Sequence, residues 1–394
     1  MTDLSIIIVN YNVRPYLEQC LDSIRKSAQG LEVETIVVDN NSSDGSVACL
    51  KERFTDVVFI ENNTNCGFAK ANNQGIKIAK GRYVMLLNPD TVITESTISD
   101  CIRFMDEHDD AGALGVKMLK SDGSFAYESR RGIPTPFVAF CKMSGLGTLF
   151  PNSRTFGRYY MRYLDIDSAE RIDIISGACM FIRRSTLDKS GMLDEDFFMY
   201  GEDIDLSYRL LQTGKHNYYL PTRILHYKGE STQKSSYRYV YNFYNAMLIF
   251  FRKHFSNYNF LFSLPIKAAI FVKAFMAYMS NLMRGKHNDK EEKLGFMRQF
   301  MFLFIGSPDN ISDVEKIASE YGLQLTALPP TDDILLKGHA SVANHQQYGY
   351  IIYDTSLFTY GDILRYFDTA DHHGPKMAFY HPEQKSIITD NYVF

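Results

Sequence analysis

The chain has 394 residues and a formal net charge of −4, and 45% of its residues are hydrophobic, with 14% aromatic. The apolar content excludes a disordered chain, and the length suggests two domains, or one large domain with an appendage. The small negative charge argues against a general nucleic-acid binder, because such proteins neutralise many phosphates with basic side chains.

In chain order, strand and helix patterns alternate over the first hundred residues. Short apolar runs rich in β-branched side chains, which are typical of buried parallel strands, lie at residues 4–9, 33–39, 57–61 and 82–87. Helical spacing of apolar residues fills the gaps at 13–24 and 68–79, and a further helix is predicted from Thr91 to Met105. This rhythm predicts an α/β fold with a Rossmann-like, doubly wound sheet.

The later part of the chain is less regular. From about Gly112 the pattern loosens, and the irregular stretch at 121–173 is long enough to be functional. Helical segments and a charged link follow, and the last hundred residues start afresh as a small α/β unit of unknown role. The predicted boundaries are a first domain at 1–234, a helical segment with linker at 235–293, and a C-terminal domain at 294–394.

The cysteines and the N-terminus bear on the compartment. A strand-like run starts at Leu4 with no basic region before it, so no signal peptide is predicted. Residues 260–283, interrupted by Lys267 and Lys273, predict either an amphipathic helix on the inner face of the plasma membrane or a helix packed between domains. Six cysteines without a CxxC spacing predict reduced core thiols in a cytoplasmic protein: Cys20, Cys49, Cys66, Cys101, Cys141 and Cys179.

Ligands of a wound sheet bind at the carboxyl ends of its strands, so the polar residues there are candidates for a binding site. These residues are Asn10, Tyr11, Asn12, Asp39, Asn88 and Asp90. A carboxylate such as Asp90 can hold a divalent cation that neutralises a diphosphate leaving group. Asp39 and Asp90 both have a structural alternative, in which the side chain caps the helix that follows.

Seven segments carry a resemblance to a known family. In chain order they are VNYN, VVDNNSSDGS, NTNCGFAKANNQGI, LLNPDT, SGACMFIRR, DEDFFMYGEDIDLSYRL and LHYKGEST. Together they resemble the family 2 glycosyltransferases of the GT-A fold, and within them the bacterial rhamnosyltransferase-like branch. The resemblance covers roughly residues 3–255, so it implies nothing about the C-terminal unit.

On the donor side, the resemblance implies that Asp39 holds the nucleobase or ribose of a sugar nucleotide. The segment with Asn65, Gly67, Phe68 and Asn72 opens a helix, where glycine permits close backbone approach and the helix N-terminus favours phosphate. The family usually offers an Asp-x-Asp pair for the metal, and this chain has Asn88 in the first position. Asp90 and His226 are the implied ligands of Mn²⁺ or Mg²⁺, although a lone histidine is also often structural.

On the acceptor side, the resemblance assigns the general base to Asp203 of the Glu-Asp pair, while Glu202 holds the acceptor or braces the loop. Taken alone, acids at a helix N-terminus are also favourable against the helix dipole. The remaining acceptor-side candidates are the small residues Ser176 and Gly177, Tyr200 and Gly201 of the aromatic loop, and Arg130 and Arg131 for an acceptor phosphate.

The resemblance implies an inverting, metal-dependent glycosyltransferase of surface polysaccharide synthesis. Its donor would be a dTDP- or UDP-linked sugar, with rhamnose favoured, and its acceptor a glycan or a polyprenyl-diphosphate-linked sugar. Two alternatives stay open: a catalytically weak member that serves as a sugar-nucleotide-binding scaffold, and a nucleotidyltransferase. The second is disfavoured because NYNVRPYL after the first strand lacks a glycine-rich loop. The sequence does not identify the oligomeric state, so a homo-oligomer stays open.

Overall fold

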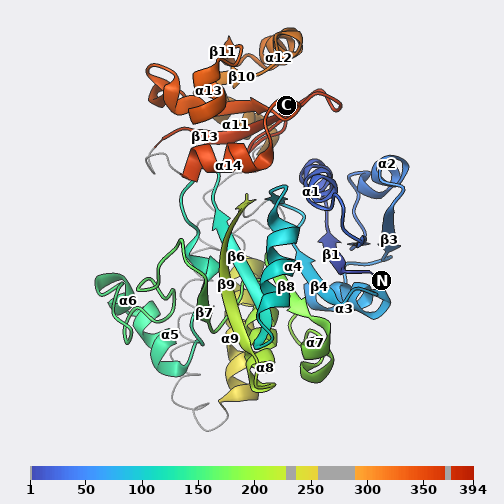
Figure 1. The fold of residues 1–394 in the computed structure, drawn as a ribbon, viewed down its shortest axis with the longest axis vertical. Helices are drawn as coiled ribbons and strands as arrows, with labels where there is room; N and C mark the ends of the chain where they lie inside the picture. The colour runs from blue at the N-terminus through green and yellow to red at the C-terminus, as the bar shows by residue number, and fades with distance from the viewer. Residues whose placement is uncertain (1, 228–236, 256–288, 369–373) are drawn as a thin grey trace.

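A large mixed sheet forms the N-terminal part of the chain in the computed structural model, which describes residues 2–227, 237–255, 289–368 and 374–394 (Figure 1). Its strands are β1 (Leu4–Asn10), β2 (Val33–Asp39), β3 (Val57–Glu61), β4 (Tyr83–Leu87), β5 (Thr91–Ile93), β6 (Ala111–Leu119), β7 (Glu170–Ile172), β8 (Cys179–Arg183) and β9 (His216–His226). They lie in the order β3-β2-β1-β4-β8-β6-β9-β5, with β7 also paired to β9. The first four strands are parallel, as the sequence predicts.

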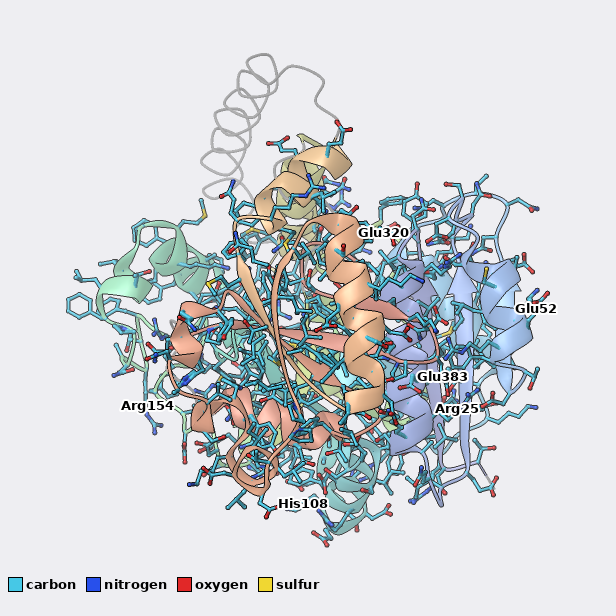
Figure 2. The ribbon with its side chains drawn as sticks, turned by 90° about the horizontal axis from the view of Figure 1, so that it is seen from above. Arg25, Glu52, His108, Arg154, Glu320 and Glu383 are labelled. Carbon is cyan, nitrogen blue, oxygen red and sulfur yellow. The ribbon has the colours of Figure 1, made fainter. Side chains whose placement is uncertain are left out.

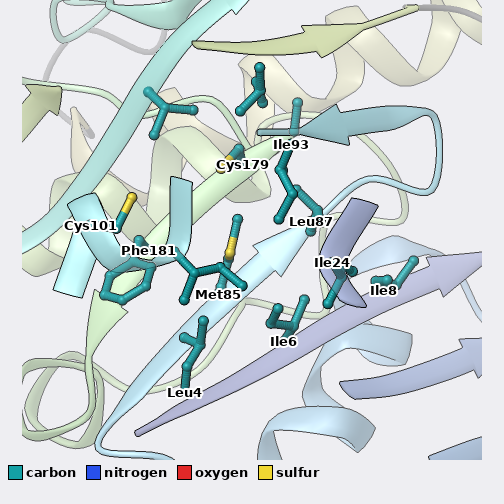
Figure 3. Packing of buried hydrophobic residues seen from close by; sticks show 14 of the residues in the cluster. Leu4, Ile6, Ile8, Ile24, Met85, Leu87, Ile93, Cys101, Cys179 and Phe181 are labelled. Atoms are coloured by element: carbon teal, nitrogen blue, oxygen red, sulfur yellow. The ribbon is translucent and has the colours of Figure 1, made fainter. Parts of the chain in front are cut away.

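Helices cover both faces of this sheet. They are α1 (Arg14–Ser27), α2 (Ser46–Arg53), α3 (Phe68–Ile78), α4 (Thr97–Glu107), α5 (Pro136–Met143), α6 (Leu146–Leu149), α7 (Arg184–Ser190), α8 (Glu202–Gln212) and α9 (Tyr237–His254), with a 3₁₀ turn η1 at Tyr127–Ser129. Alternate residues of the strands enter different cores. Figure 3 shows Ile6, Ile8 and Met85 packed with Ile24 of α1 and Cys101 of α4, whereas the opposite face packs against α3, α7 and α8.

Two sequence predictions for this region are wrong. Thr91–Ile93 is not the start of a helix, because it pairs with β9 as the antiparallel strand β5, and the helix α4 begins only at Thr97. The loosened pattern after Gly112 conceals β6, a fully buried strand that also pairs with β9. In addition, Cys49 is exposed, so the prediction of core thiols fails for that residue.

The C-terminal part forms a second, smaller sheet in the order β11-β10-β12-β13-β14. Its strands are β10 (Met301–Ile305), β11 (Gln324–Leu328), β12 (Tyr350–Asp354), β13 (Lys376–His381) and β14 (Ser386–Ile388). Its helical segments are α11 (Asp289–Met297), α12 (Pro308–Tyr321), α13 (Asp332–Lys337) and α14 (Tyr360–Asp368), with 3₁₀ turns η3 (Gly338–Ser341) and η4 (His345–Gln347). Part of the predicted charged link therefore belongs to α11.

The C-terminal part packs directly on the first sheet. Glu95, just after β5, accepts hydrogen bonds from the backbone N–H groups of Tyr360 and Gly361 at the start of α14, both at 2.9 Å. Arg53 pairs with Glu383, which Figure 2 shows beside the N-terminal helices. Side chains of β5 and β9 share one apolar core with α14. The C-terminal part thus supports the two strands that flank the candidate metal residues.

No helix within the described ranges combines the length and apolar character needed to cross a bilayer. The predicted amphipathic segment at 260–283 lies outside the described residues.

Candidate active site

A cavity of about 510 Å³ opens at the carboxyl ends of β1 and β4, where the sequence predicts a binding site. Its walls come from the ends of these strands, from the start of β8, and from α5, α8 and α9. The predicted site residues that line it are Tyr11, Asn65, Phe68, Asn88, Arg131, Ser176, Gly177, Tyr200, Gly201, Glu202, Asp203 and His226. Residues from both predicted sides therefore meet in one space.

Asp39 is buried at the end of β2, and the next residue, Asn40, lines the cavity. The two carboxylate oxygens of Asp39 accept hydrogen bonds from Asn10 Nδ2 at 2.7 Å and from the Ser42 backbone N–H at 2.8 Å. Asn12, in the left-handed region at φ 56°, accepts from the Ser43 N–H. The helix α2 starts later, after Gly45, so the alternative in which Asp39 caps that helix is excluded. These contacts instead fix the two turns that follow β1 and β2.

The segment that opens α3 holds the acidic loop at residues 194–201. The Phe68 N–H donates to the Phe198 carbonyl at 2.8 Å, and a Cβ on Gly67 would lie 2.6 Å from that same oxygen. This amide is therefore occupied, which does not support the predicted phosphate role of this helix N-terminus. Asn72 donates within α3, to the Phe68 carbonyl. Its neighbour Asn73, which the sequence did not single out, exchanges two hydrogen bonds with the Leu193 backbone.

The end of the acidic loop adopts an uncommon backbone. Tyr200 and Gly201 have φ values of 71° and 84°, and a left-handed tyrosine is uncommon. A Cβ on Gly201 would lie 3.0 Å from the Ala246 Cβ and from a Phe197 ring carbon. This tight turn ends at α8, so it presents Glu202 and Asp203 at the first turn of that helix. Strain of this kind is often retained where it positions functional groups.

Asp203 lies at the centre of a buried polar group. Its Oδ2 accepts hydrogen bonds from the Arg131 guanidinium and from the Gly177 N–H at 3.2 Å, and its Oδ1 accepts from the Ile204 N–H at 2.8 Å. A Cβ on Gly177 would lie 3.1 Å from the Asp203 Cβ, which explains a small residue there. Burial, the largest single effect, lowers the pKa of Arg131, but the charge and hydrogen bond of Asp203 together with Tyr159 and Glu128 raise the pKa above its ordinary value.

Glu202 has a different environment from its neighbour. Only 6% of the residue is exposed, and among the described residues its Oε2 has no hydrogen-bond partner. Burial, followed by the negative charge of Asp203, raises the pKa of Glu202 to about 8. Both effects favour the protonated form of Glu202, and in that form the side chain can donate a hydrogen bond. The two adjacent acids thus differ: protonated Glu202 can donate a hydrogen bond, whereas the Asp203 carboxylate accepts three.

Replacing Glu202 by Gln tests whether the pKa of Glu202 is raised in the folded chain. Between about pH 4.5 and about pH 8 the folded chain retains a proton that the unfolded chain releases, so the wild type loses stability as pH rises through this range. Gln does not titrate, so the variant lacks this loss of stability. We expect the difference in Tm between the variant and the wild type to be several degrees more in favour of the variant at pH 8 than at pH 5. Thermal unfolding at both pH values measures this. Glu107→Gln, at an exposed position in α4, is the control, and the same pH dependence in all three proteins would contradict the assignment.

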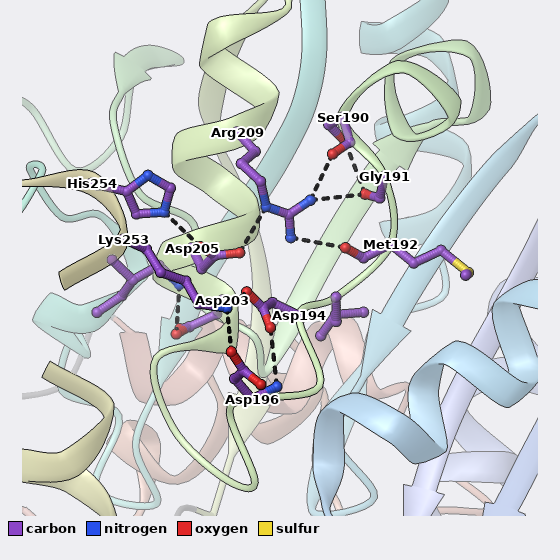
Figure 4. Close-up of polar contacts among 12 residues, drawn as sticks. Ser190, Gly191, Met192, Asp194, Asp196, Asp203, Asp205, Arg209, Lys253 and His254 are labelled. Carbon is purple, nitrogen blue, oxygen red and sulfur yellow. Dashed lines mark hydrogen bonds and ion pairs between the residues drawn. The ribbon is translucent and has the colours of Figure 1, made fainter. Parts of the chain in front are cut away.

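The helix α8 is anchored by polar contacts of Asp205 and Arg209, neither of which lines the cavity (Figure 4). The buried Asp205 accepts hydrogen bonds from Arg209 Nε and contacts His254 Nε2, both at 2.7 Å. Arg209 also donates to the carbonyls of residues 190–192. Lys253 of α9 pairs with Asp194 at the start of the acidic loop. Helices α8 and α9 and the loop are therefore held together around Asp203.

Asp90 and His226 meet through strand pairing. Thr91 of β5 lies opposite His226 of β9, and the Tyr227 N–H donates to the Asp90 carbonyl at 3.1 Å. This register places His226 Nε2 3.4 Å from Asp90 Oδ1 and 3.5 Å from Asn88 Nδ2. The helix-cap alternative for Asp90 is excluded because a strand follows it. Among the described residues, no three His, Cys, Asp or Glu side chains cluster as a metal site, so this part of the chain offers two ligands with Asn88 beside them.

Arg130 does not reach the cavity. Its side chain is buried over the rings of Phe125 and Tyr219, and it donates to the Asp165 carbonyl at 2.6 Å. Arg131, the next residue, points to the opposite side and contacts Asp203. Lys142 and Tyr159 also line the cavity, and sequence patterns did not identify either of them.

A profile described as Glycosyl transferase family 2 matches residues 5–191. The chain carries a family 2 glycosyltransferase domain. It is similar to an N-acetylglucosaminyl-diphospho-decaprenol L-rhamnosyltransferase of Mycobacterium tuberculosis, with 29% identity over 263 residues that cover 64% of this chain and 84% of that protein. The low-salt glycan biosynthesis hexosyltransferase Agl10 of Haloferax volcanii is 28% identical over 213 residues, which cover 53% and 62%.

A solved glycosyltransferase structure is also similar to this chain. A mannosyltransferase from Pyrobaculum calidifontis, in complex with GDP-Man and Mn²⁺, gives a TM-score of 0.45 at 17% identity, over 72% of this chain and 76% of that one. The fold class of this family 2 domain is confirmed by the family profile and the sheet: a GT-A sheet followed by helices and a small C-terminal α/β unit. The family profile and the relatives named above are those of glycosyltransferases, so the activity class predicted from the sequence, glycosyl transfer, is confirmed.

Proposed function

We propose that this family 2 domain transfers a sugar, with inversion, from a nucleoside-diphosphate sugar to an acceptor hydroxyl beside Asp203. The observation that carries the proposal is the single cavity in which Asp203 and Arg131 meet Asn88, Pro89 and His226. A donor diphosphate beside Asn88 and His226, with an acceptor beside Asp203, would place the reacting atoms between them. The transfer is assigned to residues 1–234, with the helical segment and the C-terminal unit in supporting roles.

Asp203 is the proposed general base. A base must accept the proton of the attacking hydroxyl, and the raised pKa of Glu202 disfavours the deprotonated form that this role requires. Arg131 and the Gly177 N–H orient the Asp203 carboxylate toward the cavity. As Asp203 takes the proton, the acceptor oxygen attacks the anomeric carbon on the face opposite the diphosphate. The bond between that carbon and the diphosphate oxygen breaks, the nucleoside diphosphate leaves, and the configuration of the anomeric carbon is inverted. Glu202 is proposed to donate a hydrogen bond to the acceptor.

Asp90 and His226 are the proposed holders of a divalent cation, Mn²⁺ or Mg²⁺. Their facing atoms are 3.4 Å apart, close to the separation of about 3 Å between neighbouring ligands of one octahedral ion. Carboxylate with imidazole suits Mn²⁺ well. Bound there, the ion would neutralise charge that develops on the diphosphate. Asn88 is proposed to orient the diphosphate. The exposed Tyr11 is proposed to contact the nucleobase of the donor, near the buried Asp39.

The substrate class is inferred from the relatives. The mycobacterial protein is named for rhamnosyl transfer to a lipid-linked N-acetylglucosamine diphosphate. We therefore propose a dTDP- or UDP-linked donor, with rhamnose favoured, and a polyprenyl-diphosphate-linked acceptor at the inner face of the plasma membrane. The product would enter a surface polysaccharide.

The test is nucleoside-diphosphate release from a panel of dTDP-, UDP- and GDP-sugars, with Mn²⁺, Mg²⁺ or EDTA and a lipid-linked oligosaccharide extract as acceptor. We expect acceptor-stimulated release from one donor class that EDTA abolishes. A donor that binds but is never turned over with any acceptor would favour the alternative of a sugar-nucleotide-binding scaffold.

A further inference from the structure

Helices α5 and α6 expose an unusual amount of apolar surface. The helix α5, PFVAFCKM, has one charged residue, and it buries Val138, Ala139 and Cys141. Five of the fourteen exposed large hydrophobic residues in the described part of the chain fall within residues 137–150. We call them the apolar face: Phe137 (50% exposed), Phe140 (54%), Met143 (49%), Leu149 (69%) and Phe150 (48%). Clustered exposure of this kind marks an interaction surface.

Two exposed cations, Arg154 and Arg158, lie in the segment around the apolar face. Residues 130–164 contain six Lys or Arg side chains and no Asp or Glu, but Arg130 is buried, Arg131 pairs with Asp203, and Lys142 lines the cavity. Figure 2 shows Arg154 at the edge of the molecule beside α5 and α6. Apolar side chains flanked by cations are what an anionic lipid surface binds, since the lipid phosphates pair with the cations while the apolar groups leave water.

The apolar face continues into the active-site cavity. Pro134, Ala139, Lys142 and Met143 line that cavity, so α5 has one face toward it and another toward solvent. Lys142 lies on the cavity side, where its Nζ is 3.5 Å from the centroid of the ring of Tyr159, which also lines the cavity. A lipid-linked acceptor could therefore place its sugar in the cavity while its lipid stays beyond α5.

We propose that α5 and α6 dock the enzyme on an anionic bilayer, with the apolar face in the lipid–water interface and Arg154 and Arg158 at the level of the phosphates. Docking would deliver a lipid-linked acceptor to Asp203, and this purpose rests on the proposed function. The docking itself requires neither donor nor acceptor.

The test is flotation of the full chain with vesicles of phosphatidylcholine alone or with phosphatidylglycerol added. We expect wild type to bind the anionic vesicles, and Leu149→Glu to lower the partition coefficient at least about tenfold. Leu336→Glu is the matched control, because Leu336 is 65% exposed in the C-terminal part, and it should bind like wild type. Phe140→Ser serves as a second variant, with circular dichroism to check folding.

Three outcomes would overturn the docking proposal. Wild type could fail to bind vesicles, the two Leu variants could bind equally, or Leu149→Glu could change the mass in solution and leave vesicle binding intact. The last result would make the apolar face a protein contact. Because flotation is independent of turnover, absence of transferase activity alone would count against the proposed function and leave the docking result unaffected.

Discussion

Replacing Asp203 by Asn should lower glycosyl transfer by about 10³-fold while the donor still binds with near wild-type affinity. Loss of a positioned general base typically costs about 10² to 10⁴ in rate. Asn retains the shape of the side chain and can still accept hydrogen bonds from Arg131 and the Gly177 N–H, so the loop should stay in place. Initial rates of nucleoside-diphosphate release, together with calorimetric titration of the donor, separate the loss of turnover from the loss of binding.

Asp196→Asn is the matched control for this substitution. Asp196 lies seven positions before Asp203, in the acidic loop, and pairs with Lys253 outside the residues that line the cavity. We expect its transfer rate to remain within about twofold of wild type, as for most surface changes. If Asp203→Asn kept full activity while Glu202→Gln abolished it, the base would be Glu202 and the assignment made here would be wrong.

Replacing Asp90 by Asn should remove divalent-cation binding and lower transfer by about 10²-fold or more. Asp90 is the only carboxylate that the register of β5 and β9 brings to His226 among the described residues. With an amide in its place, that part of the chain offers no anionic ligand. Electron paramagnetic resonance of Mn²⁺ measures binding directly, and release assays measure turnover. Unchanged Mn²⁺ binding in this variant would place the ion elsewhere.

The converse substitution, Asn88→Asp, should strengthen cation binding. It adds a second carboxylate next to His226, and more ligand charge raises the affinity for a divalent cation, here on the order of tenfold. The Mn²⁺ titration used for Asp90→Asn reports this change as well. An affinity equal to or weaker than that of wild type would show that Asn88 does not face the ion.

The parallel sheet could be predicted because its strands are short apolar runs that burial on both faces requires. The strand β6 lacks that signature, since Gly115 leaves room for Ile175, whose Cγ2 would lie 2.9 Å from a Cβ there. The helix α5 was missed for the opposite reason. Its nearly uniform apolar composition gives no helical periodicity, and this same composition produces the apolar face.

Individual site residues could be predicted better than their partners. Asp90, Asp203 and His226 follow from their motifs, but the contact of Asp203 with Arg131 joins positions 72 residues apart. The role of Asn73 also depends on a distant segment, the backbone of Leu193. Tertiary contacts of this kind leave no local pattern in a single sequence.

The most direct test of the central claim is the anomeric configuration of the product. Proton NMR of the transferred sugar, compared with the donor, reports whether the configuration at the anomeric carbon has changed. Attack by an acceptor activated by Asp203, on the face opposite the diphosphate, predicts an inverted linkage that forms in wild type and not in Asp203→Asn. A retained configuration would contradict the single displacement proposed here.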